Sequence, residues 1–469
     1  MTINYVPFDQ QIENLRESYK SRDFQKAIKQ SVKINEQDKT NLEAWMILGA
    51  SHMALNNFQE AVSAFKHACE LSPSNAEAFS NLGAAYKNDG DPYNAKLCYK
   101  KSLILIPSHL PARYNLSVIL YELGCFRESK VEIRKVLSQN PDHSDALHLL
   151  GMIYEGLGKT NKAKTAFDKA IEFDPTHKGA LMSRWKLLFT AAKYTEALKD
   201  SDAALKIGES RSLATLYALD RHDEILSRIK VYEESDPYNM NIAAFVSFFE
   251  STTNRLTGYN FLDNPLNYII TDNIHNKCQE SGTTIVEIID DLMKVKAVES
   301  PTKNTTIGGF QSPQGLNIFS MKSIPIINLK KIIVRAVKSY YKKYKSKNCK
   351  FISDWPDSAR LFGWHVILKK GGHQSLHNHP SGWLSGVIYL KVVPDLGREE
   401  GAIEFGLNSP FFSSDKTERY VIHPVEGDIL LFPSSLYHRT IPFTADQDRV
   451  IVSFDVIPRN IKKLNPTHR

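Results

Sequence analysis

The N-terminal part of the chain repeats one pattern of small and large apolar residues. Small residues recur every 34 positions, at Ala27, Ala61, Ala95, Ser129, Ala163 and Ala197. Around them each unit carries apolar residues at helical spacing and a proline near its end, for example Trp45, Leu48, Gly49, Phe65 and Pro73. Such spacing predicts amphipathic helices, and proline ends them. Each unit is therefore predicted to be a pair of antiparallel helices, which the small residues allow to approach closely.

This period and these residue types resemble tetratricopeptide repeats. About six units are predicted over residues 8–211. The unit that begins near residue 178 departs most, because Arg184 and Trp185 replace the expected leucine and glycine. The resemblance implies a superhelix whose concave face binds a protein or an extended peptide. The alternative is an array that only supports the rest of the chain or dimerises it, and the oligomeric state stays open.

The pattern changes twice after the repeats. Residues 212–300 lose the repeat but keep helical patterning, which predicts a helical connector. From about residue 351, short runs rich in β-branched residues alternate with Gly, Pro, Asp and Asn, as in WHVILK, LSGVIYLKVV, GAIEFG, RYVIHPV, GDILLFP and RVIVSFDVI. These runs predict strands. The fold class is therefore multidomain α + β: an all-α superhelix, then a double-stranded β-helix (jelly roll) over residues 301–469.

Composition narrows the classes of partner and compartment. The net charge of +7 is mild for 469 residues. Much of it comes from residues 328–350, where apolar residues at helical spacing predict an amphipathic helix with a solvated lysine-rich face rather than a nucleic-acid patch. No apolar run approaches the length of a membrane span, and the N-terminus lacks the pattern of a signal peptide. Five scattered cysteines favour a reducing compartment, so we expect a cytoplasmic protein without nucleic-acid or membrane partners.

Histidines gather in the predicted β region. His373, His377 and His379 lie between two strand runs, in a predicted loop opened by Gly371-Gly372, and His438 lies far along the chain inside a second strand pair. Two imidazoles on one loop and a third held by a distant strand make a plausible site for a first-row transition metal.

An arginine follows the distant histidine. Arg449 opens the run RVIVSFDVI, and if it and His438 lie on neighbouring antiparallel strands they are near cross-strand partners. A fixed guanidinium close to a metal suits a carboxylate. Metal and carboxylate anchor together suggest a 2-oxo acid bound to iron.

Three stretches, GWHVILKKGGHQSLHNHPSGWLSGVIYL, GDILLFPSSLYHRTIPF and DRVIVSFDVIP, resemble the iron(II)/2-oxoglutarate oxygenases that occur fused behind tetratricopeptide repeats. The resemblance covers roughly residues 260–460. It implies His377 and His438 as metal ligands and Arg449 as the partner of the terminal carboxylate of 2-oxoglutarate. The usual pattern has an acidic residue two positions after the first histidine, where this chain has His379. Either His379 is a third neutral ligand, or two histidines and water hold the iron.

Two further residues are candidates for holding the co-substrate. The two-residue period of a strand places Ser453 on the same face as Arg449, and Tyr389 lies on the preceding run. His373 is expected beside the site rather than in it, and Trp364 is expected to pack around it.

The resemblance implies an iron(II)/2-oxoglutarate-dependent dioxygenase, a hydroxylase of a protein or peptide that the repeats recruit. One alternative is a repeat scaffold whose barrel is catalytically inactive or a cupin-like metal-binding module. Another is an oxygenase of small molecules or glycans, in which the repeats serve assembly. The substrate and the carbon oxidised stay open.

Overall fold

The computed structural model describes residues 7–204, 209–295, 297–299, 305–313, 315–394 and 397–459. The chain divides into two compact units, Met1–Ser183 and Arg184–Arg469. Among the described helices, none combines the length and the apolar composition that a membrane span requires.

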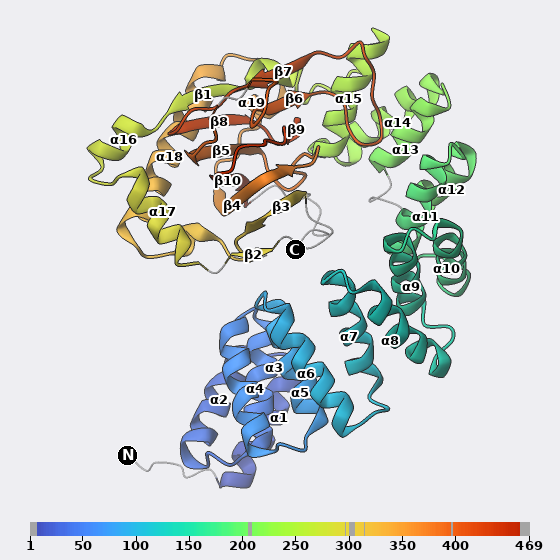
Figure 1. The fold of residues 1–469 in the computed structure, drawn as a ribbon, viewed down its shortest axis with the longest axis vertical. Helices are drawn as coiled ribbons and strands as arrows, with labels where there is room; N and C mark the ends of the chain where they lie inside the picture. Colours follow the sequence, from blue (N-terminus) through green and yellow to red (C-terminus); the bar gives the residue numbers. More distant parts are fainter. Residues whose placement is uncertain are drawn as a thin grey trace. The chain divides into compact units, whose positions relative to one another are not determined.

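Short antiparallel helix pairs follow one another from the N-terminus, as the 34-residue period predicts (Figure 1). Their bounds are α1 Phe8–Lys20, α2 Phe24–Gln37, α3 Leu42–Ala54, α4 Phe58–Leu71, α5 Ala76–Asn88, α6 Pro92–Leu105, α7 Leu110–Glu122, α8 Phe126–Gln139, α9 Ser144–Gly156, α10 Thr160–Phe173, α11 Lys178–Thr190 and α12 Tyr194–Ala203. The predicted tetratricopeptide architecture is confirmed.

Close contact between glycine and an aromatic ring fixes several of these pairs. A methyl group placed on Gly151 of α9 would lie 2.3 Å from Phe167 of α10, and one on Gly49 of α3 would lie 2.7 Å from Phe65 of α4. Neither helix pair has room for a side chain at the glycine. In the pair α7/α8 serines replace the small apolar residues, and the Ser129 hydroxyl donates a hydrogen bond to the Ser117 carbonyl at 2.7 Å.

Contacts within the second unit explain why the sixth repeat departs from the repeat pattern. Trp185 is fully buried and donates its indole N–H to the Thr215 hydroxyl at 2.9 Å. Its ring packs edge-on against Phe411, with centroids 4.9 Å apart. Arg184 pairs with Asp200 at 2.6 Å. Trp185 therefore packs against a helix and a loop that follow the repeats in the chain, whereas Arg184 forms an ion pair within its own repeat.

The second unit contains further helices, two 3-10 turns and the strands. Its helices after α12 are α13 Glu209–Ala218, α14 His222–Ser235, α15 Met240–Thr253, α16 His275–Glu280, α17 Ile285–Met293, α18 Ile324–Tyr344 and α19 Lys350–Ser353, with turns η1 Pro265–Tyr268 and η2 Ile318–Ser320. The strands are β1 Ile270–Asn273, β2 Val298–Glu299, β3 Thr306–Gln311, β4 Ala359–Gln374, β5 Leu384–Lys391, β6 Ile403–Gly406, β7 Arg419–Ile422, β8 Asp428–Pro433, β9 Tyr437–Thr440 and β10 Arg449–Pro458.

The described strands form two antiparallel sheets. The larger has the order β1-β8-β5-β10-β4-β3-β2, and the smaller has the order β7-β6-β9. The six runs rich in β-branched residues are all strands, which confirms the predicted order of helical repeats followed by a β region. The closed jelly roll and the division at residues 211 and 300 stay predictions. Strand β1 arises within the expected helical connector, and it pairs with β8.

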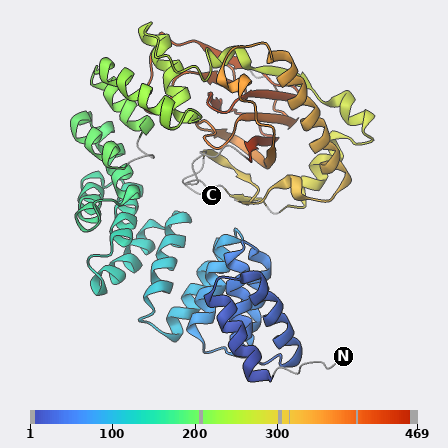
Figure 2. The same ribbon diagram turned by 180° about the vertical axis from the view of Figure 1, so that it is seen from behind.

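One hydrophobic core joins the helices and sheets of this unit. It contains buried residues from Leu198 to Val456. Helix α18 lies beside the larger sheet in both views (Figures 1 and 2) and buries Leu329, Ile333 and Tyr340 against the core. The lysines between them stay outside this core, as the helical spacing predicts.

Candidate metal centre

Backbone pairing brings the predicted metal loop against β9. The His377 N–H donates to the His438 carbonyl at 3.0 Å, and the His438 N–H donates back to the His377 carbonyl at 2.9 Å. The His379 N–H donates to the Ser434 carbonyl at 2.9 Å. Two segments far apart in sequence are therefore held in register by the main chain, before any metal is considered.

The three imidazoles form one cluster. His377, His379 and His438 each offer one ring nitrogen, and these nitrogens lie within 4.8 Å of one another. Their ring centroids are 4.4 to 5.2 Å apart. His373 stays outside the cluster, and its Nδ1 lies 3.2 Å from the Gly371 carbonyl.

The Nδ1 atom of each clustered histidine has a hydrogen-bond acceptor. His377 Nδ1 lies 2.7 Å from the Ser375 carbonyl, and His438 Nδ1 lies 3.1 Å from the Leu436 carbonyl. His379 Nδ1 lies 2.7 Å from Oδ1 of Asp455. Since carbonyl and carboxylate oxygens only accept, each Nδ1 carries the proton, and the lone pair is on Nε2. Three Nε2 lone pairs in one cluster, each fixed from behind, are the donor set of a transition-metal site.

Asp455 belongs to a buried hydrogen-bond network behind His379. The Ser385 hydroxyl donates to Asp455 Oδ1 at 2.6 Å and lies 2.7 Å from the Ser434 hydroxyl. A methyl group on Gly382 would lie 2.5 Å from the Ser434 hydroxyl oxygen, so the loop after His379 packs tightly over this network. No local feature of the sequence marks Asp455 for this role, because its partner His379 is 76 residues away.

Burial keeps two of the imidazoles neutral. It lowers the pKa of His377 to about 3, with a smaller contribution from the neighbouring His379. Burial, followed by the two neighbouring histidines, lowers the pKa of His438 well below its usual value. Aromatic rings cover the cluster: Trp364 lies 5.6 Å from His379 and Phe432 lies 4.7 Å from His438, between centroids. Neutral imidazoles are the form that binds metal.

Arg449 does not lie on a strand next to His438, so the cross-strand hypothesis is wrong. His438 is on β9, which pairs with β6 in the smaller sheet. Arg449 is on β10, between β4 and β5 in the larger sheet, opposite Leu368. The turn between them passes from one sheet to the other. Arg449 instead shares a strand with Asp455, six residues along and on the same face.

Arg449 is a buried cation whose acidic partner is missing among the described residues. Its side chain is 1% exposed, and its guanidinium carbon lies 4.8 Å from the centroid of the Tyr389 ring. One Nη donates to the Gly401 carbonyl, whereas Nε and the Tyr389 hydroxyl have no hydrogen-bond partner. Burial lowers the pKa of Arg449 and raises the pKa of Tyr389 to about 12. Ser453 is buried on the same strand face.

The two glycines before the histidines belong to a strand rather than to a loop. Gly371 and Gly372 lie within β4, where its pairing with β3 is irregular. Gly371 has a φ of 76°, and a methyl group on Gly372 would lie 2.5 Å from the Gly308 carbonyl oxygen. Glycine therefore allows β4 to bend and continue until just before the metal loop.

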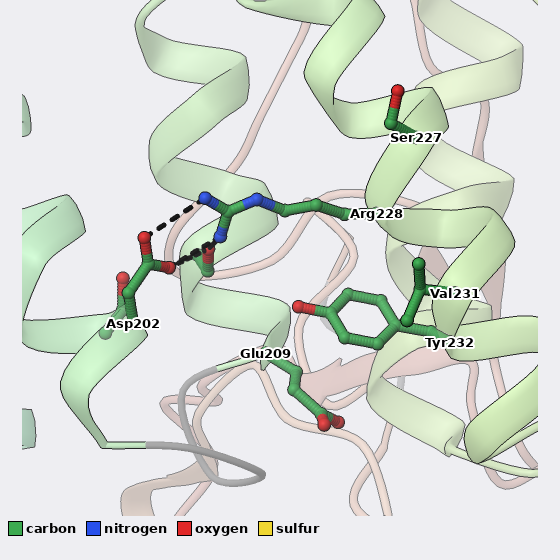
Figure 3. A pocket seen from close by; sticks show the side chains of 8 residues that line it. Asp202, Glu209, Ser227, Arg228, Val231 and Tyr232 are labelled. Carbon is green, nitrogen blue, oxygen red and sulfur yellow. Dashed lines mark hydrogen bonds and ion pairs between the residues drawn. The ribbon is translucent and has the colours of Figure 1, made fainter.

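A pocket of about 440 Å³ between α12, α13 and α14 is distinct from this centre (Figure 3). Arg228 crosses it and donates to the two carboxylate oxygens of Asp202 at 2.5 and 3.0 Å. Because Asp202 neutralises the Arg228 guanidinium, we interpret this ion pair as structural.

Comparisons with known proteins agree with both parts of the chain. Residues 363–455 match the family described as "Putative 2OG-Fe(II) oxygenase". Residues 49–90 match a "TPR repeat" model, and residues 76–109 and 144–177 match a "Tetratricopeptide repeat" model. No curated protein matches the chain.

Several solved structures are similar to part of this chain. One is MamA, 24% identical, with a TM-score of 0.34 over 36% of this chain and 92% of that one. Another is YrrB, whose title describes "a TPR protein with an unusual peptide-binding site", 23% identical, with a TM-score of 0.35 over 37% and 90%. A third is a tetratricopeptide repeat protein from Parabacteroides merdae, 17% identical, with a TM-score of 0.41 over 48% and 92%. The chain thus carries N-terminal tetratricopeptide repeats followed, at residues 363–455, by a domain that matches the family described as "Putative 2OG-Fe(II) oxygenase".

Proposed function

We propose that this protein is an iron(II)/2-oxoglutarate-dependent dioxygenase that hydroxylates a protein or peptide recruited by its repeats. The observation that carries the proposal is the pairing of a three-histidine cluster with a buried, unpaired arginine in one domain. Each half requires something that the chain itself does not provide. The three Nε2 atoms of the cluster offer lone pairs that no proton occupies. The Arg449 guanidinium carries a positive charge, and no described carboxylate neutralises it.

The surroundings of Arg449 fit one end of a dicarboxylate. A buried guanidinium without a counterion is costly, and a bound carboxylate removes that cost. Two donors have no hydrogen-bond partner, Nε of Arg449 and the hydroxyl of Tyr389, whose ring centroid lies 4.8 Å from the guanidinium carbon. We propose that both donate to the terminal carboxylate of 2-oxoglutarate, and that Ser453 lines the same face.

The histidine cluster fits a metal that must also bind a co-substrate. His377, His379 and His438 would each bind through Nε2, and three protein ligands leave positions open on a six-coordinate ion. Bound iron(II), with 2-oxoglutarate and dioxygen, supplies the chemistry that converts a C–H bond to C–OH as 2-oxoglutarate becomes succinate and carbon dioxide. Trp364 and Phe432 limit the access of water to the ligands.

Asp455 compensates for the acidic ligand that the usual family pattern has at the position of His379. Three neutral imidazoles leave the charge of the metal uncompensated. Asp455 places a carboxylate directly behind His379, which makes that imidazole a stronger donor and fixes its orientation. This supports His379 as the third ligand, in preference to a centre of two histidines and water.

The repeats supply the second half of the proposal. Tetratricopeptide arrays mediate protein–protein interactions, and we propose that the array over residues 8–211 holds the substrate protein near the oxygenase domain. Recruitment at a second site raises the effective concentration of the substrate at the first.

Turnover of 2-oxoglutarate to succinate by the purified protein with iron(II) tests the activity. We expect slow turnover without substrate and its loss, by at least about 100-fold, in His438→Ala, because that variant removes a ligand from the only described three-histidine cluster. His373→Ala, which changes a histidine outside the cluster, is the matched control and should retain turnover. Absence of succinate from a folded, metal-loaded wild type would favour a scaffold with an inactive barrel.

A further inference from the structure

The first compact unit, Met1–Ser183, contains a groove of about 840 Å³ formed by three consecutive helices, α8, α9 and α10. Helices α8 and α10 are the second helices of successive repeats. The groove is lined by apolar residues, which include Leu137, Leu147, Leu150 and Phe173, and by the cations Arg134, Lys162 and Lys169. Its size lies in the range of ligand pockets.

The cations around the groove are not neutralised within the protein. No described carboxylate forms an ion pair with Arg134, Lys162 or Lys169, although Lys164 on the same helix pairs with Asp168 at 3.0 Å. Arg134 is positioned by a hydrogen bond from Nη2 to the Tyr154 hydroxyl at 2.9 Å. Glu172 is the one acidic side chain among the described lining residues. The groove therefore carries a net positive charge.

The apolar part of the groove is open to solvent. Phe173 ends α10 and is 51% exposed, and Leu137 and Leu150 are partly exposed. Apolar surface surrounded by charge is the usual composition of a site for another chain. A nucleic acid would use the cations but not the leucines and Phe173.

We propose that this groove binds an extended acidic peptide in which two carboxylates, three residues apart, flank an apolar side chain. Lys162 and Lys169 are seven positions apart on one face of α10, so their Cα atoms are separated by two helical turns, about 10.5 Å. In a peptide with the extended polyproline II conformation, which has three residues per turn, residues i and i+3 lie on the same face and are separated by about 9 Å. The two carboxylates therefore reach the two lysines together, and the apolar side chain between them lies toward the leucines of α9.

This site differs from the one that the repeat family suggests. The expected partner surface is the concave face of the superhelix, whereas the groove lies between the second helices of two repeats and has the first helix α9 as its floor. The inference concerns peptide binding alone. It stands whether or not the oxygenase domain is active.

Fluorescence anisotropy with the full-length protein and a short labelled peptide carrying Asp at i, Leu at i+1 and Glu at i+3 tests the inference. We expect binding that weakens at least about tenfold in the double variant Lys162→Glu/Lys169→Glu, because both attractive contacts become repulsive. The matched control is Lys26→Glu/Lys33→Glu. These two exposed lysines of α2 occupy the same positions in the first repeat, with the same spacing and the same change of charge, and they should leave the affinity unchanged.

A charge-swapped peptide completes the design. With lysines at i and i+3, the peptide should bind Lys162→Glu/Lys169→Glu more tightly than it binds the wild type. Equal weakening by the two double variants would show attraction to the net charge of the protein and would overturn the inference. So would equal affinity for a peptide with its acids at i and i+1, or no binding by the wild type at about 1 mM peptide, the weak end of specific recognition.

Discussion

The repeats and the β region of this protein differ in how far apart in the sequence their contacting residues lie. In the repeats, each apolar cluster draws on neighbouring helices, such as the cluster of α4 and α5 that contains Phe65 and Leu82. In the second unit, one core contains residues from Leu198 to Val456. The metal centre depends on contacts between residues distant in sequence, 61 positions apart for His377 and His438 and 76 positions apart for His379 and Asp455. A substitution in a repeat should therefore affect the stability of that part of the chain. A substitution near the metal centre should affect the binding of metal or co-substrate.

The largest effect of a single substitution on co-substrate binding is expected at Arg449. Arg449→Gln removes the buried cation, and the apparent affinity for 2-oxoglutarate should fall by about 100-fold or more, since a buried charge pair contributes several kcal/mol. The affinity of Arg449→Lys for 2-oxoglutarate should lie between those of the wild type and Arg449→Gln, because lysine keeps the charge but lacks the planar guanidinium fork. Metal affinity should stay near wild type in both variants, and calorimetric titration measures the two affinities separately. Unchanged affinity for 2-oxoglutarate would contradict the assignment of Arg449.

In the repeats, Gly151→Val should reduce the free energy of unfolding of the repeat unit by about 2–3 kcal/mol, because the new side chain collides with Phe167. Denaturant unfolding followed by circular dichroism measures the loss. The affinity of the oxygenase domain for metal should not change. A parallel loss of metal affinity would contradict the separation between local repeats and a centre built from distant residues.

Asp455→Asn tests the role proposed for the carboxylate behind His379. Asparagine keeps an acceptor for His379 Nδ1 but removes the charge, so metal affinity should fall by about 10- to 100-fold while the fold is retained. With cobalt(II) as a probe, the ligand-field absorption should shift, because the donor strength of one imidazole changes. Ser385→Ala is the comparison variant: it removes one hydrogen bond to Asp455 and leaves the charge. An Asp455→Asn protein with wild-type metal affinity and spectrum would reduce Asp455 to a packing residue.

The smallest effect concerns His365, which lies on β4 with both ring nitrogens unpartnered. Burial lowers its pKa to about 4. As the pH falls below about 6.5, the unfolded chain takes up a proton that the folded chain does not, so stability is lost on acidification. At pH 5.5 this one residue should cost about 1.4 kcal/mol relative to pH 8. His365→Leu should lose less stability than the wild type between these two pH values, and an equal loss would show that His365 does not contribute.

The same difference in range explains what the sequence could predict. The 34-residue period revealed the helix pairs, because the contact of Gly151 with Phe167 joins residues only 16 positions apart. The branched runs revealed the strands, because strand preference is local. The assignment of β9 and β10 to different sheets depends on partners distant in sequence, and the cross-strand hypothesis for Arg449 was wrong for that reason. Strands β1 and β3 were missed because ITDN is mostly exposed and TIGGFQ contains two glycines.

The candidate site shows the same limit. The spacing of His377, His379 and His438 could be found in the sequence because histidines are rare and chemically distinctive. The role of Asp455 could not be found, because an aspartate on a strand has no special signal until the fold places His379 at its carboxylate. The alternation of Arg449, Ile451, Ser453 and Asp455 on one strand face was the available clue.

An anaerobic titration of the purified protein with iron(II) and 2-oxoglutarate tests whether the histidine cluster and Arg449 together hold the metal and the co-substrate. We expect a metal-to-ligand charge-transfer absorption that appears only when both are present, saturates at one equivalent of iron per chain, and is absent in His438→Ala. If iron binds to the wild type at one equivalent but 2-oxoglutarate produces no such absorption, the protein is not a 2-oxoglutarate-dependent oxygenase.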